Sequence, residues 1–156
     1  MSKASKDFTV RNPVGTDLAF IYASFLESYR YDSVIGRHCK NHVFFEAYSY
    51  VIDQLLIKSK VLICCHPETP ECIFGYLIYD GNLIHYVFVK KIFRRLGIAE
   101  LLFKTAFGDN DALQYSHKTR MCYDILDQPK FNKYKFNPFS LYKGVPEHGK
   151  TKATQG

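Results

Sequence analysis

Apolar positions follow a helical spacing in two parts of the chain and form strand-like runs elsewhere. Between Leu18 and Leu26 they recur every three or four residues, which predicts a helix with Thr16 as its N-cap. The same spacing predicts a second helix over residues 43–58. The polar segment between them, residues 31–41, is expected to form a loop.

Short apolar runs bounded by turn residues predict the strands. The tripeptide Asp80-Gly81-Asn82 separates two of these runs and is typical of a tight β-hairpin turn. Helical patterns return over residues 97–107 and 123–133. The expected strands are residues 8–11, 60–65, 72–79, 83–89, 112–116 and 136–142.

Length and composition indicate one folded domain over residues 1–147 and a polar tail over residues 148–156. The chain has 156 residues, and 47% of them are hydrophobic, which is enough for a sizeable core. No apolar run approaches the ~20 residues of a membrane span. The N-terminus lacks the apolar stretch of a secretory signal, and the five cysteines form no CxxC pair. We therefore expect a cytoplasmic protein with reduced thiols and no membrane insertion.

The net charge of +6 fits an anionic cofactor, an acidic protein partner or nucleic acid. No helix-turn-helix, zinc-finger or RNP motif supports nucleic-acid binding. His38, Cys39 and His42 lack a fourth ligand for a zinc site, so no metal is expected. The neighbouring Arg37 and Lys40 make this segment basic, which suits an acidic acceptor or an acceptor associated with nucleic acid.

The densest positive charge lies in a segment with the pattern strand, turn, helix. The apolar run that ends at Val89 leads into a turn with four basic residues and a glycine, and a helical pattern follows. A helix N-terminus presents N–H groups without helical partners, and its dipole favours anions. Gly97 lets a phosphate approach the backbone closely, while Arg94 and Arg95 add forked donors. The sequence therefore predicts a phosphate site at this turn.

The pattern Arg94-x-x-Gly97-x-Ala99 resembles the acyl-CoA-binding motif of the GNAT superfamily of N-acetyltransferases. Val89 stands five residues before the arginine, where the family's strand usually ends. The resemblance implies an α/β (α+β) fold with a mixed, mostly antiparallel sheet, flanking helices and a splayed strand pair that holds the cofactor. The order of predicted elements is that of a GNAT domain. The implied cofactor-binding residues are Phe88, Val89, Arg94, Arg95, Leu96, Gly97, Ile98 and Ala99.

The resemblance implies that an acceptor amine attacks acetyl-CoA, the cosubstrate, directly. The acceptor is an amine of a protein or a small molecule, and the sequence indicates neither its identity nor an oligomeric state. The reaction needs a base for the amine proton, a donor to the carbonyl oxygen and an acid for the thiolate. Strand alternation places His85, the candidate base, on one face with Val87 and Val89. Ser116 is expected to bond pantetheine or protonate the thiolate, and Tyr134 is the candidate acid.

Two features depart from the family's pattern. The strand before the turn carries no Asp or Glu, and Asn132 stands where the family has a tyrosine. His85 can also be a structural histidine, and His117 is a second candidate base. The alternative function is therefore a GNAT-fold protein with little or no catalysis that binds a macromolecule, either an acidic protein or nucleic acid.

Overall fold

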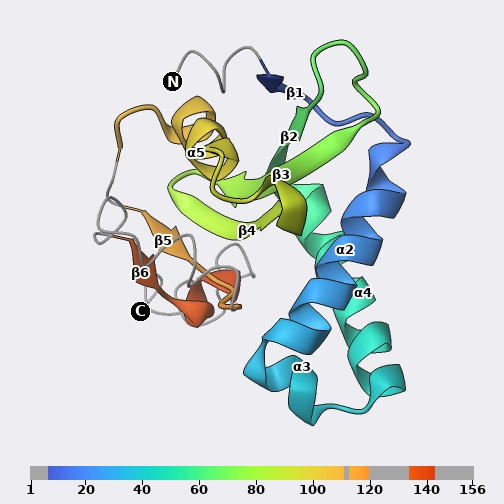
Figure 1. Cartoon of the computed structure of the whole chain (residues 1–156). Coiled ribbons are helices and arrows are strands. Elements are labelled where there is room, and N and C mark those ends of the chain that lie inside the picture. The colour runs from blue at the N-terminus through green and yellow to red at the C-terminus, as the bar shows by residue number, and fades with distance from the viewer. Residues whose placement is uncertain (1–6, 111–112, 120–133, 143–156) are drawn as a thin grey trace.

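The computed structural model describes residues 7–110, 113–119 and 134–142. A six-stranded sheet runs through the described part, with helices on both faces (Figure 1). The first four strands pair antiparallel, and the last two add in parallel, so the predicted mixed, mostly antiparallel sheet is confirmed. In spatial order, which is also chain order, the strands are β1 (Thr9–Arg11), β2 (Lys60–Cys65), β3 (Ile73–Asp80), β4 (Leu83–Val89), β5 (Gln114–Tyr115) and β6 (Lys135–Phe136).

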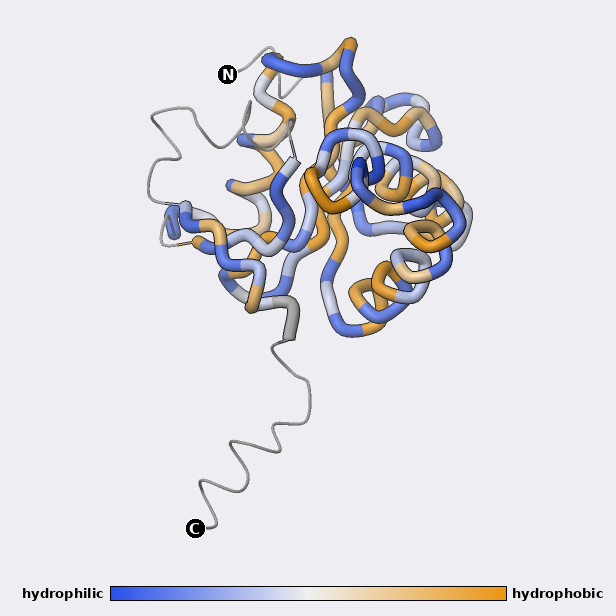
Figure 2. Tube along the Cα trace, turned by 90° about the horizontal axis from the view of Figure 1, so that it is seen from below, coloured by the Kyte–Doolittle hydropathy of each residue, from blue (hydrophilic) through white to orange (hydrophobic). Residues whose placement is uncertain are grey.

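Two layers of helices enclose the sheet. Helices α2 (Asp17–Asp32) and α4 (Asn41–Lys58) pack on one face, and α5 (Ile98–Phe107) packs on the other. Helix α2 buries Ile21 and Phe25, one turn apart, against sheet residues of its own cluster. Figure 2 shows hydrophobic segments running through the centre of the molecule. The core is thus divided by the sheet into two apolar clusters.

The segment expected to be a loop between the two long helices is mostly helical, so that prediction is wrong. Helix α2 runs to Asp32, and a short helix, α3 (Val34–His38), follows. The Ser33 hydroxyl caps α3 by accepting the N–H of Gly36 at 2.9 Å. Gly36 fits because a Cβ there would lie 2.4 Å from the carbonyl oxygen of Arg30. Local composition suggested a loop, whereas packing against α2 selects a helix.

The expected cap at Thr16 is also wrong, because its side chain makes no capping bond. The neighbouring Asp17 is buried instead, and its carboxylate accepts the Val14 N–H at 2.7 Å. It also forms an ion pair with Arg11 of β1 at 2.7 Å. The bond from Arg11 is the main reason that the pKa of Asp17 is lowered. This pair fastens the edge strand to the start of α2.

The C-terminal part differs from its prediction as well. The strand expected over residues 136–142 is only β6, and a 3₁₀ helix, η3 (Pro138–Tyr142), follows it. Pro138 has no N–H to donate to a strand ladder, which accounts for the early end. The helix expected over residues 123–133, the domain boundary at 147 and the tail over 148–156 lie outside the described residues.

Gly75 provides a test of how tightly the end of β4 is held. It pairs with Val89, and a Cβ at this position would lie 2.4 Å from the carbonyl oxygen of Phe88. We expect Gly75→Ala to lower the free energy of unfolding by about 1–3 kcal/mol through overpacking, measured by urea denaturation. Gly15→Ala is the control, because no atom lies within 4 Å of its Cβ position. Equal stability of the two variants would show that β4 shifts without cost.

Candidate active site

The turn between β4 and α5 has the backbone of an anion cradle. Arg95 and Gly97 both have positive φ, 66° and 88°, so the chain bends sharply before the helix. The first hydrogen bond of α5 runs from the Leu101 N–H to the Gly97 carbonyl at 2.9 Å. The N–H groups of Ile98 and Ala99 therefore have no partner within the helix, as the sequence predicted.

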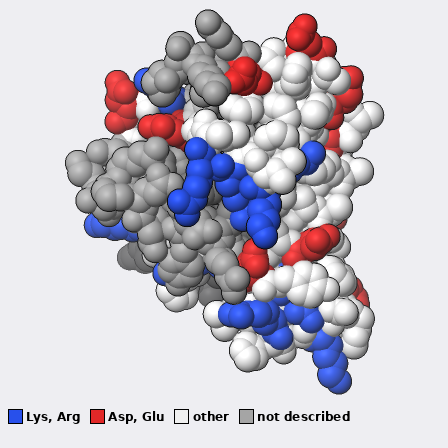
Figure 3. All heavy atoms as spheres, in the orientation of Figure 1, with Lys and Arg blue, Asp and Glu red and all other residues white. Residues whose placement is uncertain are grey.

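Side chains of the turn divide between the core and the surface. The 3₁₀ helix η1 (Lys91–Phe93) links the strand to the turn, and its first residue, Lys91, is exposed. Lys and Arg side chains gather at the centre of the face in Figure 3. Leu96 is 50% exposed, whereas the Ile98 side chain is buried under α5. Ile98 is thus placed to meet a ligand only through its backbone.

Arg94 has a structural bond that the sequence did not indicate. Its Nε donates to the Val89 carbonyl oxygen at 2.9 Å, so the side chain folds back onto the end of β4. It also lines a groove of about 450 Å³ between α2 and the turn. We call this the α2 groove; its lining includes Phe20, Glu27, Asp32, Phe88, Lys91 and Arg94.

The β4–β5 ladder is short and ends beside a β-bulge. Ile84 pairs with Tyr115, and the Ser116 N–H donates to the Ile84 carbonyl at 3.0 Å. On the other side of β4, Ile84 lies opposite Tyr79 but Tyr86 lies opposite Ile78, so His85 is an extra residue. Beyond this bulge β4 continues to its end without a described β5 partner. The two strands therefore diverge from a point marked by His85 and Ser116.

The bulge also interrupts the expected alternation of side chains. Val87 and Val89 share an apolar cluster under α5, as predicted, but Ile84 lies in the same cluster. Strict alternation would place Ile84 on the opposite face. The extra residue at the bulge shifts the alternation by one position.

Four polar side chains form a chain of hydrogen bonds at this point. His85 Nδ1 lies 3.0 Å from Ser116 Oγ, which lies 2.9 Å from His117 Nδ1. His117 Nε2 lies 3.2 Å from the hydroxyl of Tyr48, on α4. His85, Ser116 and His117 are all buried. The structure thus brings together three residues proposed from the sequence and adds Tyr48, which sequence reasoning did not propose for the site.

Burial keeps both imidazoles neutral near pH 7. It lowers the pKa of His85 to about 4 and that of His117 to about 3, where the neighbouring His85 adds to the effect. The Ser116 hydroxyl has a single hydrogen, so it donates to one Nδ1 and accepts from the other. If the Ser116 hydrogen turns to the other imidazole, the donor and acceptor exchange in every hydrogen bond from His85 to Tyr48. The hydrogen bonds of this network, which we call the histidine relay, can therefore run in either direction.

The histidine relay predicts a loss of stability in mild acid. Because both folded pKa values lie below the unfolded value near 6.5, the unfolded chain binds more protons as the pH falls from about 6.5 to 4. Each histidine then lowers the free energy of unfolding by up to about 1.4 kcal/mol for every pH unit. His117→Gln should halve the dependence of the free energy of unfolding on pH, measured by urea denaturation at a series of pH values. An unchanged slope in His117→Gln would contradict the burial of a neutral imidazole.

Tyr134 lies apart from the histidine relay in its described contacts. Its ring packs edge-on against Phe103 of α5, at 5.7 Å between centroids. It belongs to the apolar cluster under α5, whereas the rings around His117 belong to the cluster under α2 and α4. None of the described contacts of Tyr134, the candidate acid, therefore places it beside His85, the candidate base.

Comparisons with known proteins match the fold. No family model matches the chain, and no curated protein matches its sequence. A candidate acetyl transferase from Pyrococcus furiosus is similar at 15% identity and a TM-score of 0.51, over 91% of this chain and 93% of that one. Apo-form YjaB from Escherichia coli is similar at 11% identity and a TM-score of 0.51, over 68% of each chain. Other matched structures, with TM-scores below 0.5, are described as GNAT or GCN5-related N-acetyltransferases.

The chain has the GNAT fold. Among the described residues, no group of three or more His, Cys, Asp or Glu side chains is arranged to hold a metal ion. None of the described helices has the length and apolar character needed to cross a membrane.

Proposed function

We propose that this protein transfers an acetyl group from acetyl-CoA to an amine by direct attack. The observation that carries the proposal is the end of the β4–β5 ladder at His85 and Ser116, one strand length from the basic turn. A thioester lying between the diverging strands would reach the histidine relay while its phosphates occupy the turn.

The cofactor's pyrophosphate would bind at the turn. Backbone N–H groups of Arg95 through Ala99, together with Lys91, supply donors and positive charge there. Arg94 would bond a phosphate oxygen with its terminal nitrogens while its Nε holds the end of β4. One arginine would therefore both hold the backbone of the turn and bond the phosphate that lies in it.

Backbone direction selects the donor for the thioester carbonyl. The Lys90 N–H donates to the Phe74 carbonyl of β3 at 2.9 Å. Successive N–H groups of a strand point to opposite sides, so the Val89 N–H points toward the β5 side. We propose that this end of β4, Phe88 and Val89, lies against the thioester, with the Phe88 side chain in the α2 groove.

The histidine relay offers a path for the amine proton. Nε2 of His85 bonds to none of the described residues, so it is the nitrogen left to take that proton. As Nε2 gains a proton, Nδ1 passes its own to Ser116, and the Ser116 hydrogen moves to Nδ1 of His117. His117 Nε2 then passes its proton to Tyr48, and the hydroxyl proton of Tyr48, whose side chain is only partly buried, leaves to solvent. No imidazole must hold a full charge in the core, which suits the low pKa values. Tyr134 stays a prediction as the thiolate acid.

Two measurements test this proposal together. Titration calorimetry with CoA and acetyl-CoA examines the cradle, and mass spectrometry with acetyl-CoA and a panel of amines examines transfer. Binding followed by acetylated product supports the proposal. Binding without any transfer would favour a GNAT-fold protein that binds a macromolecule, and no binding at millimolar CoA would overturn the cofactor assignment.

A further inference from the structure

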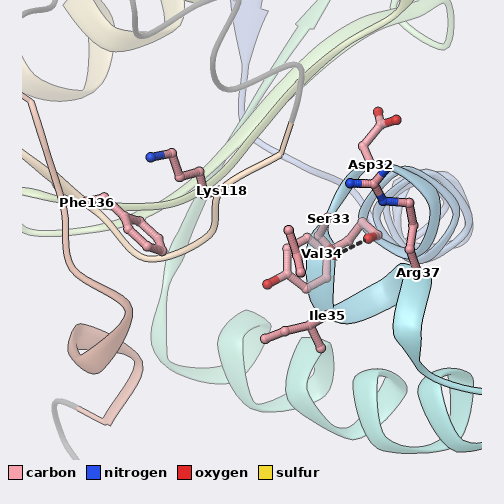
Figure 4. Close-up of a pocket in the computed structure, with 8 residues that line it drawn as sticks. Asp32, Ser33, Val34, Ile35, Arg37, Lys118 and Phe136 are labelled. Atoms are coloured by element: carbon pink, nitrogen blue, oxygen red, sulfur yellow. Dashed lines mark hydrogen bonds between the residues drawn. The ribbon is translucent and has the colours of Figure 1, made fainter.

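A second hollow lies between the α2–α3 corner and the far end of the sheet, and we call it the α3 pocket. Its volume is about 420 Å³, within the range of small-molecule sites. Figure 4 shows two facing walls, one from α2 and α3 and the other from the chain at β5 and β6. The first wall carries Asp32, Val34, Ile35 and Arg37, and the second carries Lys118 and Phe136.

The α3 pocket adjoins the histidine relay. Tyr29 also lines the pocket, and its ring centroid lies 5.0 Å from that of His117. Lys118 of the second wall directly follows His117 in the chain. Asp32 lines both this pocket and the α2 groove, which reaches Phe88 at the end of β4. An occupant therefore lies next to the position proposed for the thioester.

The walls combine exposed apolar side chains with positive charge. Val34 is 64% exposed, Ile35 58% and Phe136 41%, so the core leaves much of their surface uncovered. Apolar surface gathered around a hollow is typical of a binding site. Arg37 brings positive charge to one wall and Lys118 to the other, where its Nζ lies over the Phe136 ring, 5.3 Å from the ring centroid. This combination complements a carboxylate attached to an apolar body.

Asp32 is the one acidic side chain among the described residues that line the pocket, and its position is complementary. It lines both the α3 pocket and the α2 groove, and the lining of that groove also includes Phe88 near the end of β4. Amines arrive protonated at neutral pH, and a carboxylate attracts them. An amine held beside Asp32 would thus face the reacting end of the cofactor, while its carboxylate faces Arg37 and Lys118.

We propose that the α3 pocket binds the acceptor, and that this acceptor is a small primary amine with a carboxylate and an apolar side chain, as in an apolar amino acid. The inference rests on the proposed function, because acetyl transfer makes the amine an acceptor. Binding of such an amine depends only on the side chains of the pocket, so it can be measured without any acetyl transfer.

Binding of three matched probes to the full chain tests the inference. L-leucine has the amine, the apolar side chain and the carboxylate, leucinamide has a neutral amide in place of the carboxylate, and 3-methylbutylamine has neither. Titration followed by NMR, in the presence of CoA, should show L-leucine binding at least tenfold more tightly than the other two. Arg37→Gln and Lys118→Gln should each reduce that preference, while Lys40→Gln, an exposed cation outside the pocket, should retain it.

The outcomes separate this inference from the proposed function. Equal affinity for the three probes, no binding of L-leucine at millimolar concentration, or a preference unchanged in Arg37→Gln and Lys118→Gln would each overturn the inference. Loss of CoA binding with the leucine preference intact would instead sink the proposed function alone. CoA binding and transfer to amines without a carboxylate would retain the function and reject this acceptor class.

Discussion

Gly97→Glu is expected to abolish CoA binding, with a loss of affinity of about 100-fold or more, while the sheet and helices stay folded. Like charges brought together in a binding site cost several kcal/mol, and every 1.4 kcal/mol is tenfold in affinity. A Cβ at position 97 meets no atom within 4 Å, so the new carboxylate has room in the turn that phosphate would occupy. The positive φ of 88° adds a strain of roughly 1–2 kcal/mol. Calorimetry with CoA measures the loss of affinity, and circular dichroism of the variant shows whether the sheet and helices stay folded.

Gly81→Glu is the matched control for this variant. Gly81 lies in the β3–β4 hairpin turn, also has a positive φ, 58°, and also has no atom within 4 Å of its Cβ position. The Gly81→Glu variant therefore adds the same charge and a similar backbone strain at a site away from the β4–α5 turn. Its affinity for CoA should match that of the unchanged protein. Unchanged affinity in Gly97→Glu would place the phosphates elsewhere. An equal loss in both variants would point to net charge rather than to the turn.

The turn at Gly97 was predictable because every feature that defines it is local. A strand, four basic residues, a glycine and a helix follow one another within the segment from Leu83 to Phe107. Each of these features follows from the preferences of its own residues, so none depends on a contact with a distant part of the chain. The hairpin of β3 and β4 was predictable for the same reason, since its turn residues lie between two apolar runs.

The bulge at His85 could not be predicted from the pattern of β4. The strand is buried on both faces, so residues from Leu83 to Val89 are almost all apolar and show no alternation that an extra residue would interrupt. The relay partner Tyr48 was missed for a different reason. It lies 69 positions from His117, and an aromatic residue on a helix face reads as core in the sequence. Contacts of this kind arise from the packing of α4 against the sheet.

For Arg94 the structure adds a role to the one that the sequence predicted. The motif predicts that its guanidinium bonds phosphate oxygens at the turn. The structure adds the bond from its Nε to the Val89 carbonyl, which depends on how sharply the turn folds back. Positive φ at Arg95 makes that return possible, and a non-glycine residue in this conformation carries no clear signal in the sequence.

His85→Ala is expected to lower turnover by about 10²–10⁴-fold and to leave CoA affinity nearly intact, because the removed base would face the amine rather than the phosphates. His85→Gln should lose as much activity, since an amide can bond Ser116 but cannot take a proton. His66→Ala, in the β2–β3 turn, is the control and should remain active. Steady-state kinetics with acetyl-CoA, together with CoA titration of each variant, measure the effect.

The pH dependence separates a base from a structural histidine at position 85. Burial lowers the pKa of His85 to about 4, so it is deprotonated and able to accept a proton at all higher pH values. The kcat/KM of the unchanged protein should therefore rise with pH through a limb near pH 4, which His85→Ala should lack. Added imidazole should restore part of the turnover of His85→Ala by replacing the missing base. A folded variant with unchanged turnover would move the proton transfer to His117 or to solvent, and loss of CoA binding would mark His85 as a support for the bulge.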